Sequence, residues 1–201
     1  MLASLPHQGL SEADYEKRIV QKKKAQARDR QELLLTRSNA PRRHLETSAK
    51  FDGDFKERFE KVAAMRKTGY LVAFIGGWGT GKTQLAVELM KDRSLKGGRS
   101  TYHTAMELLM MFKATYSSDN TQTEMGVVKM LAQPELLVID EAAKRGETDW
   151  ENRLMFEILN KRYADYKDTI LIANQTREAF SKSMGPSVTR RMSEVGGLMV
   201  F

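Results

Sequence analysis

The chain has 201 residues, no cysteine, 33 Lys and Arg against 26 Asp and Glu, and a net charge of +7 at pH 7. This length suits one compact domain with an extension, and the lack of cysteine excludes a disulfide framework. No apolar run approaches the roughly 18 residues that cross a bilayer, and the first residues lack a secretory signal pattern, so we expect a cytoplasmic protein without a membrane partner.

The positive charge is concentrated in the first quarter of the chain, where the sequence predicts a long helix. Residues 1–50 contain 11 Lys and Arg and 6 Asp and Glu, a balance of +5, which leaves 22 against 20, or +2, for the remainder. A capping-box pattern begins at Ser11, and no proline or glycine follows before Leu35. Because this helix offers little apolar surface, we expect it to contact nucleic acid or an acidic partner, with a purely solvated face as the alternative.

A linker and an alternating series of helices and strands follow. Proline, serine and asparagine indicate a linker over 36–50, and we divide the chain near residue 45 into a basic helical extension at 1–45 that binds a partner and a main domain at 46–201. Helices are predicted at 54–68, 84–92, 105–116, 123–133 and 150–166, after 176 and through 191, and strands at 70–75, 99–104, 135–140, 169–173 and from 198. This alternation is typical of a three-layer α/β/α fold with a parallel sheet.

The segment after the first of these strands fits the phosphate-loop pattern GxxxxGK[ST] in full. Its glycines let backbone N–H groups converge on phosphate oxygens, and the dipole of the following helix favours an anion. Lys82 is expected to reach the β- and γ-phosphates, and Thr83 to offer a hydroxyl to Mg²⁺. A glycine-rich turn without a ligand is the alternative. The predicted nucleotide-contacting residues are Gly76, Gly77, Trp78, Gly79, Thr80, Gly81, Lys82, Thr83 and Gln84.

A second strong signal is the apolar strand that ends in Asp140 and Glu141, 57 residues after Thr83. In open α/β sheets, ligands bind at the carboxyl ends of the strands. Asp140 is therefore expected to hold Mg²⁺, directly or through water, and Glu141 to polarise the water that attacks the γ-phosphate. A strand that ends in two carboxylates can also be purely structural.

Asn174 closes the next predicted strand. In a parallel sheet, this position lies beside the end of the Asp140 strand, so the amide could orient the attacking water. Asparagine is also a favoured helix cap, and the alternative is that Asn174 caps the helix that begins at Thr176.

These motifs, in this order, resemble the AAA+ ATPases, and within them the group of DnaC-like helicase loaders and IstB-like transposition helpers. The resemblance covers roughly 51–201 and implies an AAA+ core of the P-loop NTPase class that uses ATP and Mg²⁺, with Asn174 at the sensor position. We expect no C-terminal lid domain, a feature that the loader group shares. About 45 residues precede the main domain, fewer than the helicase-binding region of loaders usually has.

The sequence SVTRRM at 187–192 resembles the segment that carries the family's arginine finger. The resemblance implies that Arg191, or else Arg190, stabilises charge on a nucleotide bound by a neighbouring subunit, and hence that the protein forms a homo-oligomer. The alternative for both arginines is a charged helix end near the C-terminal dipole.

The family also places single-stranded DNA contacts in the region of 105–116, and here this region contains Phe112, Lys113 and Tyr116. An aromatic ring beside a cation can stack on a base and neutralise its phosphate. Phe112 also belongs to the apolar stripe of its own helix, which favours packing in the core.

Together, these features predict an ATPase that loads a replicative DNA helicase: the N-terminal helix would bind the helicase, and the main domain would assemble on single-stranded DNA. The first alternative is an IstB-like helper that acts on duplex DNA with a transposase. A small-molecule P-loop kinase is a further alternative, although no acceptor site is visible, and so is a nucleotide-dependent binding module that does not hydrolyse ATP.

Overall fold

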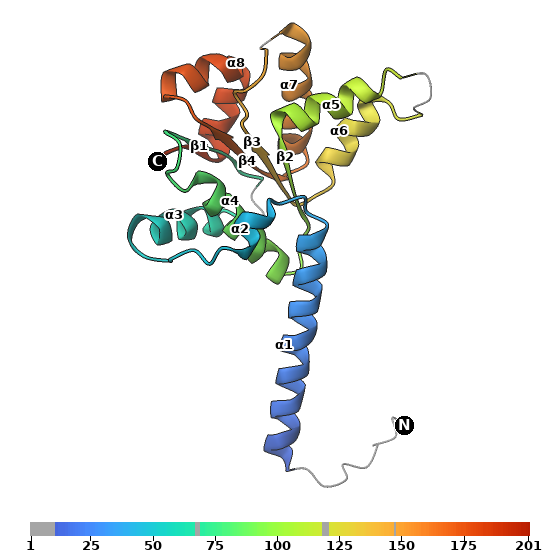
Figure 1. The fold of residues 1–201 in the computed structure, drawn as a ribbon, viewed down its shortest axis with the longest axis vertical. Coiled ribbons are helices and arrows are strands. Elements are labelled where there is room, and N and C mark those ends of the chain that lie inside the picture. The colour runs from blue at the N-terminus through green and yellow to red at the C-terminus, as the bar shows by residue number, and fades with distance from the viewer. Residues whose placement is uncertain (1–10, 67–68, 118–120, 147) are drawn as a thin grey trace.

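The structure, a computed structural model, describes residues 11–66, 69–117, 121–146 and 148–201 and has a parallel sheet at its centre (Figure 1). The strands lie in the order β2-β3-β4-β1-β5, and all neighbouring pairs are parallel. Their bounds are β1 Leu71–Ile75, β2 Ser100–Thr104, β3 Leu136–Asp140, β4 Asp168–Ala173 and β5 Gly197–Val200. Each of the five predicted strands is therefore present. The start of the predicted extension, the end of the helix predicted at 54–68 and most of the loop predicted at 117–120 lie outside the described residues.

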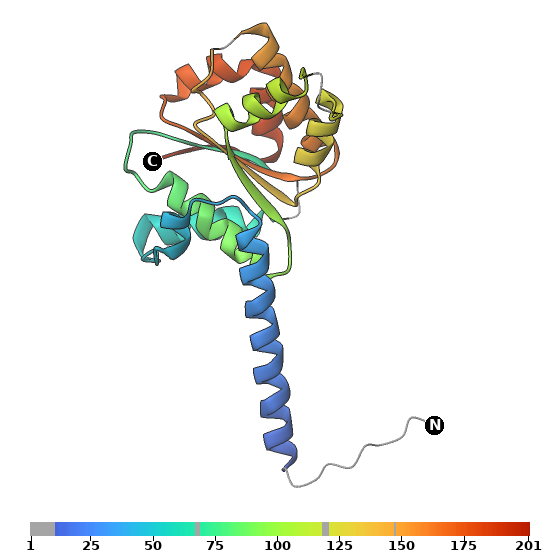
Figure 2. The ribbon, with the colours of Figure 1, turned by 45° about the vertical axis from the view of Figure 1, so that its right-hand side comes forward.

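Two layers of helices cover the two faces of the sheet (Figure 2). Within β1, Val72 and Phe74 pack on the side of α4, whereas Ala73 and Ile75 pack on the side of α5 to α8. Burial on both faces explains why β1 and β3 are almost continuously apolar. The predicted three-layer α/β/α architecture is confirmed. One layer contains α3 Gly53–Ala64 and α4 Lys82–Leu95, and the other contains α5 Ala105–Ala114, α6 Glu124–Ala132, α7 Asp149–Ala164 and α8 Arg177–Val195.

The N-terminal helix α1 (Glu12–Thr36) projects away from the domain, as Figures 1 and 2 show. None of its residues is buried. Its C-terminal part nevertheless contacts the domain, because Arg30 donates to the carbonyl of Gly97 at 3.2 Å and Gln31 donates to that of Lys91 at 3.1 Å. Within the described part of the chain, no helix is both long and apolar enough to span a membrane.

The segment predicted as a linker is partly helical. It contains the short helix α2 (Arg42–Glu46), and the carbonyl of Ser38 accepts a hydrogen bond of 2.7 Å from the backbone N–H of Tyr102 in β2. The prediction of an irregular linker is therefore wrong for this stretch, which lies along the edge of the sheet. The division of the chain near residue 45 stays a prediction.

Helix α8 joins two segments that the sequence predicts separately. Gly185 lies between them with φ of 78°, and Pro186 begins the second segment. Glycine adopts this left-handed conformation without strain, and proline fits the first turn of a helix. The chain thus bends sharply and then continues as a helix to Val195, past Arg190 and Arg191.

A buried arginine holds the amino ends of β3 and β4 together. Arg162 of α7 has no exposed surface. It donates to the carbonyls of Leu131 and Pro134 at 2.7 and 3.0 Å, and to the hydroxyl of Thr169 at 2.9 Å. Because buried carbonyls need partners, these bonds fix both strands relative to α6 and α7. The opposite ends of the strands, which carry Asp140 and Asn174, are aligned as a result.

Candidate nucleotide site

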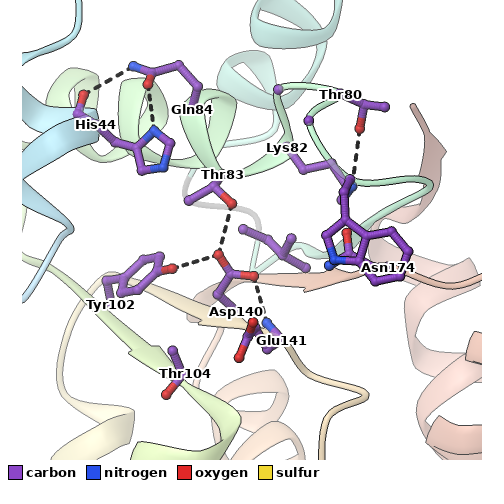
Figure 3. Close-up of a pocket in the computed structure, with 14 residues that line it drawn as sticks. His44, Thr80, Lys82, Thr83, Gln84, Tyr102, Thr104, Asp140, Glu141 and Asn174 are labelled. Carbon is purple, nitrogen blue, oxygen red and sulfur yellow. Dashed lines mark hydrogen bonds between the residues drawn. The ribbon is translucent and has the colours of Figure 1, made fainter.

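A cavity of about 530 Å³ lies at the carboxyl ends of the central strands. The phosphate loop forms one wall, β2, β3 and β4 form the floor, and His44 of α2 reaches it from the N-terminal segment (Figure 3). The cavity therefore brings together most of the residues predicted to bind or hydrolyse a nucleotide, whereas the predicted residues Gly76 and Gly77 do not line it. Its lining residues are His44, Trp78, Gly79, Thr80, Gly81, Lys82, Thr83, Gln84, Tyr102, Thr104, Asp140, Glu141, Ile172 and Asn174.

The phosphate loop takes a backbone path that requires glycine. Gly79 and Gly81 have φ of 74° and 93°, which other residues rarely adopt, and a Cβ added at either would meet no atom within 4 Å. The open space beside these positions is available to a ligand. Gly76 is needed for a different reason, because a Cβ there would lie 2.4 Å from the carbonyl oxygen of Phe201.

The Lys82 side chain folds back into the loop. Its Nζ donates to the carbonyls of Gly76 and Gly77 and to the hydroxyl of Thr80, at 3.1 Å for Gly76 and Thr80. Burial lowers the pKa of Lys82, whereas the negative charge of Asp140 raises it. The ammonium group of Lys82 lies at the N-terminus of α4, where the oxygens of a bound phosphate could replace the carbonyls as its hydrogen-bond partners.

Asp140 is the centre of a hydrogen-bond network at the floor of the cavity (Figure 3). Its Oδ2 accepts from the hydroxyl of Thr83 at 2.9 Å and from that of Tyr102 at 2.6 Å, while its Oδ1 accepts from the backbone N–H of Glu141 at 2.6 Å. Burial and the neighbouring carboxylate raise the pKa of Tyr102, so this phenol stays a donor. A hydroxyl next to a carboxylate is the oxygen-rich donor set that suits Mg²⁺.

Glu141 and Asn174 lie at the ends of neighbouring strands. Glu141 has φ of 53°, in the left-handed region that is strained for such a residue, and its carboxylate pairs with Lys144. The N–H of Ala142 donates to the carbonyl of Ile172 at 2.8 Å, which ties the turn after β3 to β4. The prediction that Asn174 lies beside the end of the Asp140 strand is confirmed.

The capping alternative for Asn174 is wrong. The N-cap of α8 is Thr176, whose hydroxyl accepts from the N–H of Ala179 at 3.3 Å. The amide of Asn174, a half-buried residue, is left to the nucleotide cavity, which it lines.

The residue after the phosphate-loop threonine connects the cavity to the N-terminal segment. The side-chain oxygen of Gln84 accepts a hydrogen bond of 2.8 Å from Nδ1 of His44, and the side-chain NH₂ of Gln84 donates to the backbone carbonyl of His44 at 3.1 Å. About two turns later, Lys91 donates to the carbonyls of His44 and Thr47 at 3.3 and 3.1 Å. Sequence reasoning missed His44 and Tyr102, because neither belongs to a local motif.

The two candidate finger residues lie on α8, and neither lines the cavity of its own chain. Arg190 pairs with Glu194 at 2.7 Å and is 68% exposed. The guanidinium of Arg191 donates to Asn160 at 2.8 Å and lies 5.2 Å from the centre of the Phe156 ring. Since α8 continues to Val195, neither arginine belongs to its last turn, so the helix-end alternative is wrong.

The predicted DNA contacts divide into buried and exposed residues. Phe112 has no exposed surface and packs in the core, so its ring cannot stack on a base, and we correct its assignment as a DNA contact. Lys113 is exposed, and Tyr116 is 62% exposed. The hydroxyl of Tyr116 accepts from the indole of Trp150 at 2.9 Å, which holds the ring in place.

Comparisons with known sequences agree with this geometry. Residues 6–190 match the family model of the IstB-like ATP binding proteins. The chain is 29% identical over 135 residues to the replicative helicase loader DnaC of Escherichia coli K12, which covers 66% of this chain and 55% of DnaC. It is 30% identical over 129 residues to the uncharacterized protein YdaV of the same strain, and this match covers 64% of this chain and 51% of YdaV. The chain thus spans about half the length of the curated relatives that it matches.

Solved structures share the fold. A crystal structure of the DnaC helicase loader matches with a TM-score of 0.66 and 22% identity over 80% of this chain and 99% of that one. DnaI matches with a TM-score of 0.61 and 16% identity over 81% and 95%. AMPPCP-bound DnaA from Aquifex aeolicus matches with a TM-score of 0.62 and 20% identity over 75% of this chain and 47% of that one. The resemblance inferred from the motifs is confirmed, and the chain belongs to the family of IstB-like ATP binding proteins, with an AAA+ domain of the DnaC kind.

Proposed function

We propose that this chain is an ATP-dependent helicase loader, which hydrolyses ATP with Mg²⁺, forms a homo-oligomer through ATP, and binds a replicative DNA helicase and single-stranded DNA. The observation that carries the proposal is the convergence of Lys82, the Thr83–Asp140 hydrogen bond and Glu141 on one cavity. The chain is also similar to a relative named as a replicative helicase loader, and this similarity supports helicase loading as the function of the ATPase site.

The site residues suit nucleotide hydrolysis. Thr83 and Asp140 would hold Mg²⁺, which when bound draws negative charge from the β- and γ-phosphates. Lys82 exchanges its carbonyl partners for phosphate oxygens, and Asn174 orients the attacking water. Glu141 accepts a proton from that water once its carboxylate leaves Lys144. The ion pair between Glu141 and Lys144 lies on the surface, with side chains that are 37% and 59% exposed, respectively. Separating this pair therefore costs about 1 kcal/mol at most.

The tyrosine at the floor of the cavity positions the carboxylate that would hold the metal ion. Tyr102 is 7% exposed and donates to the same oxygen of Asp140 as Thr83 does. Removal of a group that orients a metal-binding carboxylate typically lowers the affinity for the metal ion. We therefore assign Tyr102 a positioning role, although it has no place in the sequence motif.

A second subunit would complete the site. Arg191 or Arg190 would reach the γ-phosphate of a neighbouring chain, and the surface position of α8 makes both available for contact. Arg190 needs only to leave a surface ion pair, whereas Arg191 must leave Asn160 and two aromatic rings. Arg191 remains our first choice from the chain order, and Arg190 the second.

Helix α1 is the proposed contact for the helicase. It projects from the domain, buries none of its own residues and carries the run Lys22, Lys23 and Lys24 on an exposed stretch. The N-terminal part of this helix has no apolar face for packing against the described part of its own chain, whereas its C-terminal part contacts α4. The match to the IstB-like family model favours one other candidate function, a transposition helper that acts on duplex DNA with a transposase.

The positioning role of Tyr102 predicts a loss of Mg²⁺-dependent binding in Tyr102→Phe. We expect the affinity for a fluorescent ATP analogue to fall about tenfold with Mg²⁺ present, because the carboxylate loses one of its fixed partners, and to change little in EDTA. The exposed Tyr166→Phe is the matched control. An equal effect with and without Mg²⁺ would contradict the positioning role.

The proposed role of Glu141 predicts that Glu141→Gln still binds ATP but loses turnover. Removing a general base typically lowers the rate by about 10² to 10⁴, and phosphate release at saturating ATP measures it. Glu178→Gln, an exposed substitution in the first turn of α8, is the control. Unchanged phosphate release in Glu141→Gln would defeat this assignment and favour a different base or a module without hydrolysis.

Action of the finger in trans predicts complementation between two inactive variants. Arg191→Ala and Lys82→Ala are each expected to lose ATPase activity, and their mixture to regain part of it, with a maximum near equal amounts, because some interfaces then contain both intact residues. A parallel mixture with Arg190→Ala decides between the two arginines. Mixtures that stay inactive at every ratio would count against action in trans.

Helicase binding through α1 predicts that the full-length chain captures the replicative helicase of its own organism. The triple variant Lys22→Glu, Lys23→Glu, Lys24→Glu is expected to lose most of this capture, while Lys61→Glu on the exposed face of α3 retains it. Capture of a transposase instead of the helicase would favour the alternative function. Equal capture by the triple variant and the wild type would exclude this part of α1 as the contact.

A further inference from the structure

A second cavity, of about 380 Å³, lies on the other side of β2 from the nucleotide site. It is bounded by the end of α1, the chain that follows it, the edge of β2, and helices α5 and α6. The two cavities share no lining residue, and β2 separates them, with Tyr102 facing the first and Thr101 and His103 facing the second. Its lining residues are Leu34, Arg37, Asn39, Arg99, Ser100, Thr101, His103, Met111, Met130, Leu131, Gln133 and Pro134.

The charge of this cavity is entirely positive. Arg37 and Arg99 are exposed, and within the described residues neither side chain forms an ion pair or a hydrogen bond. No aspartate or glutamate lines the cavity. Elsewhere on the chain, arginines such as Arg93 and Arg153 pair with carboxylates. Two unpaired guanidinium groups at one hollow form a site that attracts a phosphate, whose oxygens match their planar fork of donors.

The polar groups inside the cavity are neutral. Ser100 is 6% exposed, and its hydroxyl is buried beneath the wall rather than open to the hollow. Thr101 and His103 are paired at 3.1 Å, and burial lowers the pKa of His103, so the imidazole is neutral at pH 7.

The remaining wall is apolar and adaptable. Met111 of α5, Met130 of α6, Leu34 and Pro134 form it. Methionine side chains adjust to flat or irregular surfaces and make favourable contacts with aromatic rings. A hollow lined by two arginines and by these apolar side chains fits a nucleotide unit, with its phosphate against the arginines and its base against the methionines.

We propose that this cavity binds a nucleotide unit of single-stranded nucleic acid, with Arg37 and Arg99 contacting its phosphate. The proposal rests on the proposed function, in which the chain binds a single strand. Met111, which lines the cavity, and the predicted contact Lys113 both belong to α5, although they point to nearly opposite sides of this helix. Binding would also connect the end of α1, through Arg37, to the strand that the domain holds.

The test measures binding of a fluorescein-labelled twenty-nucleotide oligo(dT) by anisotropy over a range of salt concentrations. The double variant Arg37→Ala, Arg99→Ala is expected to bind at least about tenfold more weakly at low salt, and the slope of log K against log salt to fall by about 0.7 for each lost phosphate contact. Arg37→Lys, Arg99→Lys is expected to retain most of the slope, because the charge remains. Arg177→Ala, an exposed arginine at the start of α8, is the matched control for lost charge.

The outcomes separate this inference from the proposed function. Wild-type chain that does not bind the oligonucleotide would refute both. Wild-type binding with an unchanged affinity and salt slope in the double variant would refute this site alone. Inorganic phosphate or AMP that binds at the arginines without competing with the oligonucleotide would also overturn it, in favour of a site for a free ligand. Unchanged affinity for the ATP analogue and an unchanged thermal transition in the double variant show that the fold is intact.

Discussion

The hydrogen bonds that converge on one oxygen of Asp140 are the interaction on which the rest of the site depends. Thr83 brings the start of α4 to the end of β3, and Tyr102 brings β2 to the same point. Three segments that are distant in sequence are thereby fixed around one carboxylate. Because a buried carboxylate must have partners, loss of either donor would leave this oxygen with one hydrogen bond in place of two and would loosen the segment that the lost donor holds.

Helix α4 extends this constraint to the N-terminal segment. Its first turn continues the phosphate loop and contacts His44 through Gln84, and its third turn contacts α1 and α2 through Lys91. A phosphate that binds at Lys82 therefore acts on the same rigid element that holds the base of α1. If α1 binds a helicase, nucleotide and helicase are linked through one helix, and each must change the affinity for the other wherever α4 shifts between two positions.

Local motifs predicted the part of the site that local chemistry determines. The phosphate loop, the strand that ends in Asp140 and the position of Asn174 each depend on a pattern within a few residues, and a parallel sheet brings strand ends together. Tyr102 and His44 could not be predicted in this way, because their places depend on which strand is at the edge and on how the N-terminal segment returns to α4. Phe112 shows that a local pattern can also allow two roles. Its position in the sequence was compatible with a DNA contact and with the core, and the structure shows that its side chain is buried in the core.

The edge position of β2 explains how one short strand can serve two sites. An inner strand has neighbouring strands on both sides. Among the described residues, β2 pairs with β3 alone, and its outer edge makes one main-chain hydrogen bond, from Tyr102 to the carbonyl of Ser38. Alternation of side chains then directs Tyr102 to the nucleotide and Thr101 and His103 to the second cavity. A nucleic-acid strand bound in that cavity would press on the same five residues that align Asp140 through Tyr102. The two proposed ligand sites are thus connected by the backbone of β2, which is a few residues long, pairs with β3 on one side and is held by the Tyr102–Ser38 hydrogen bond on the other.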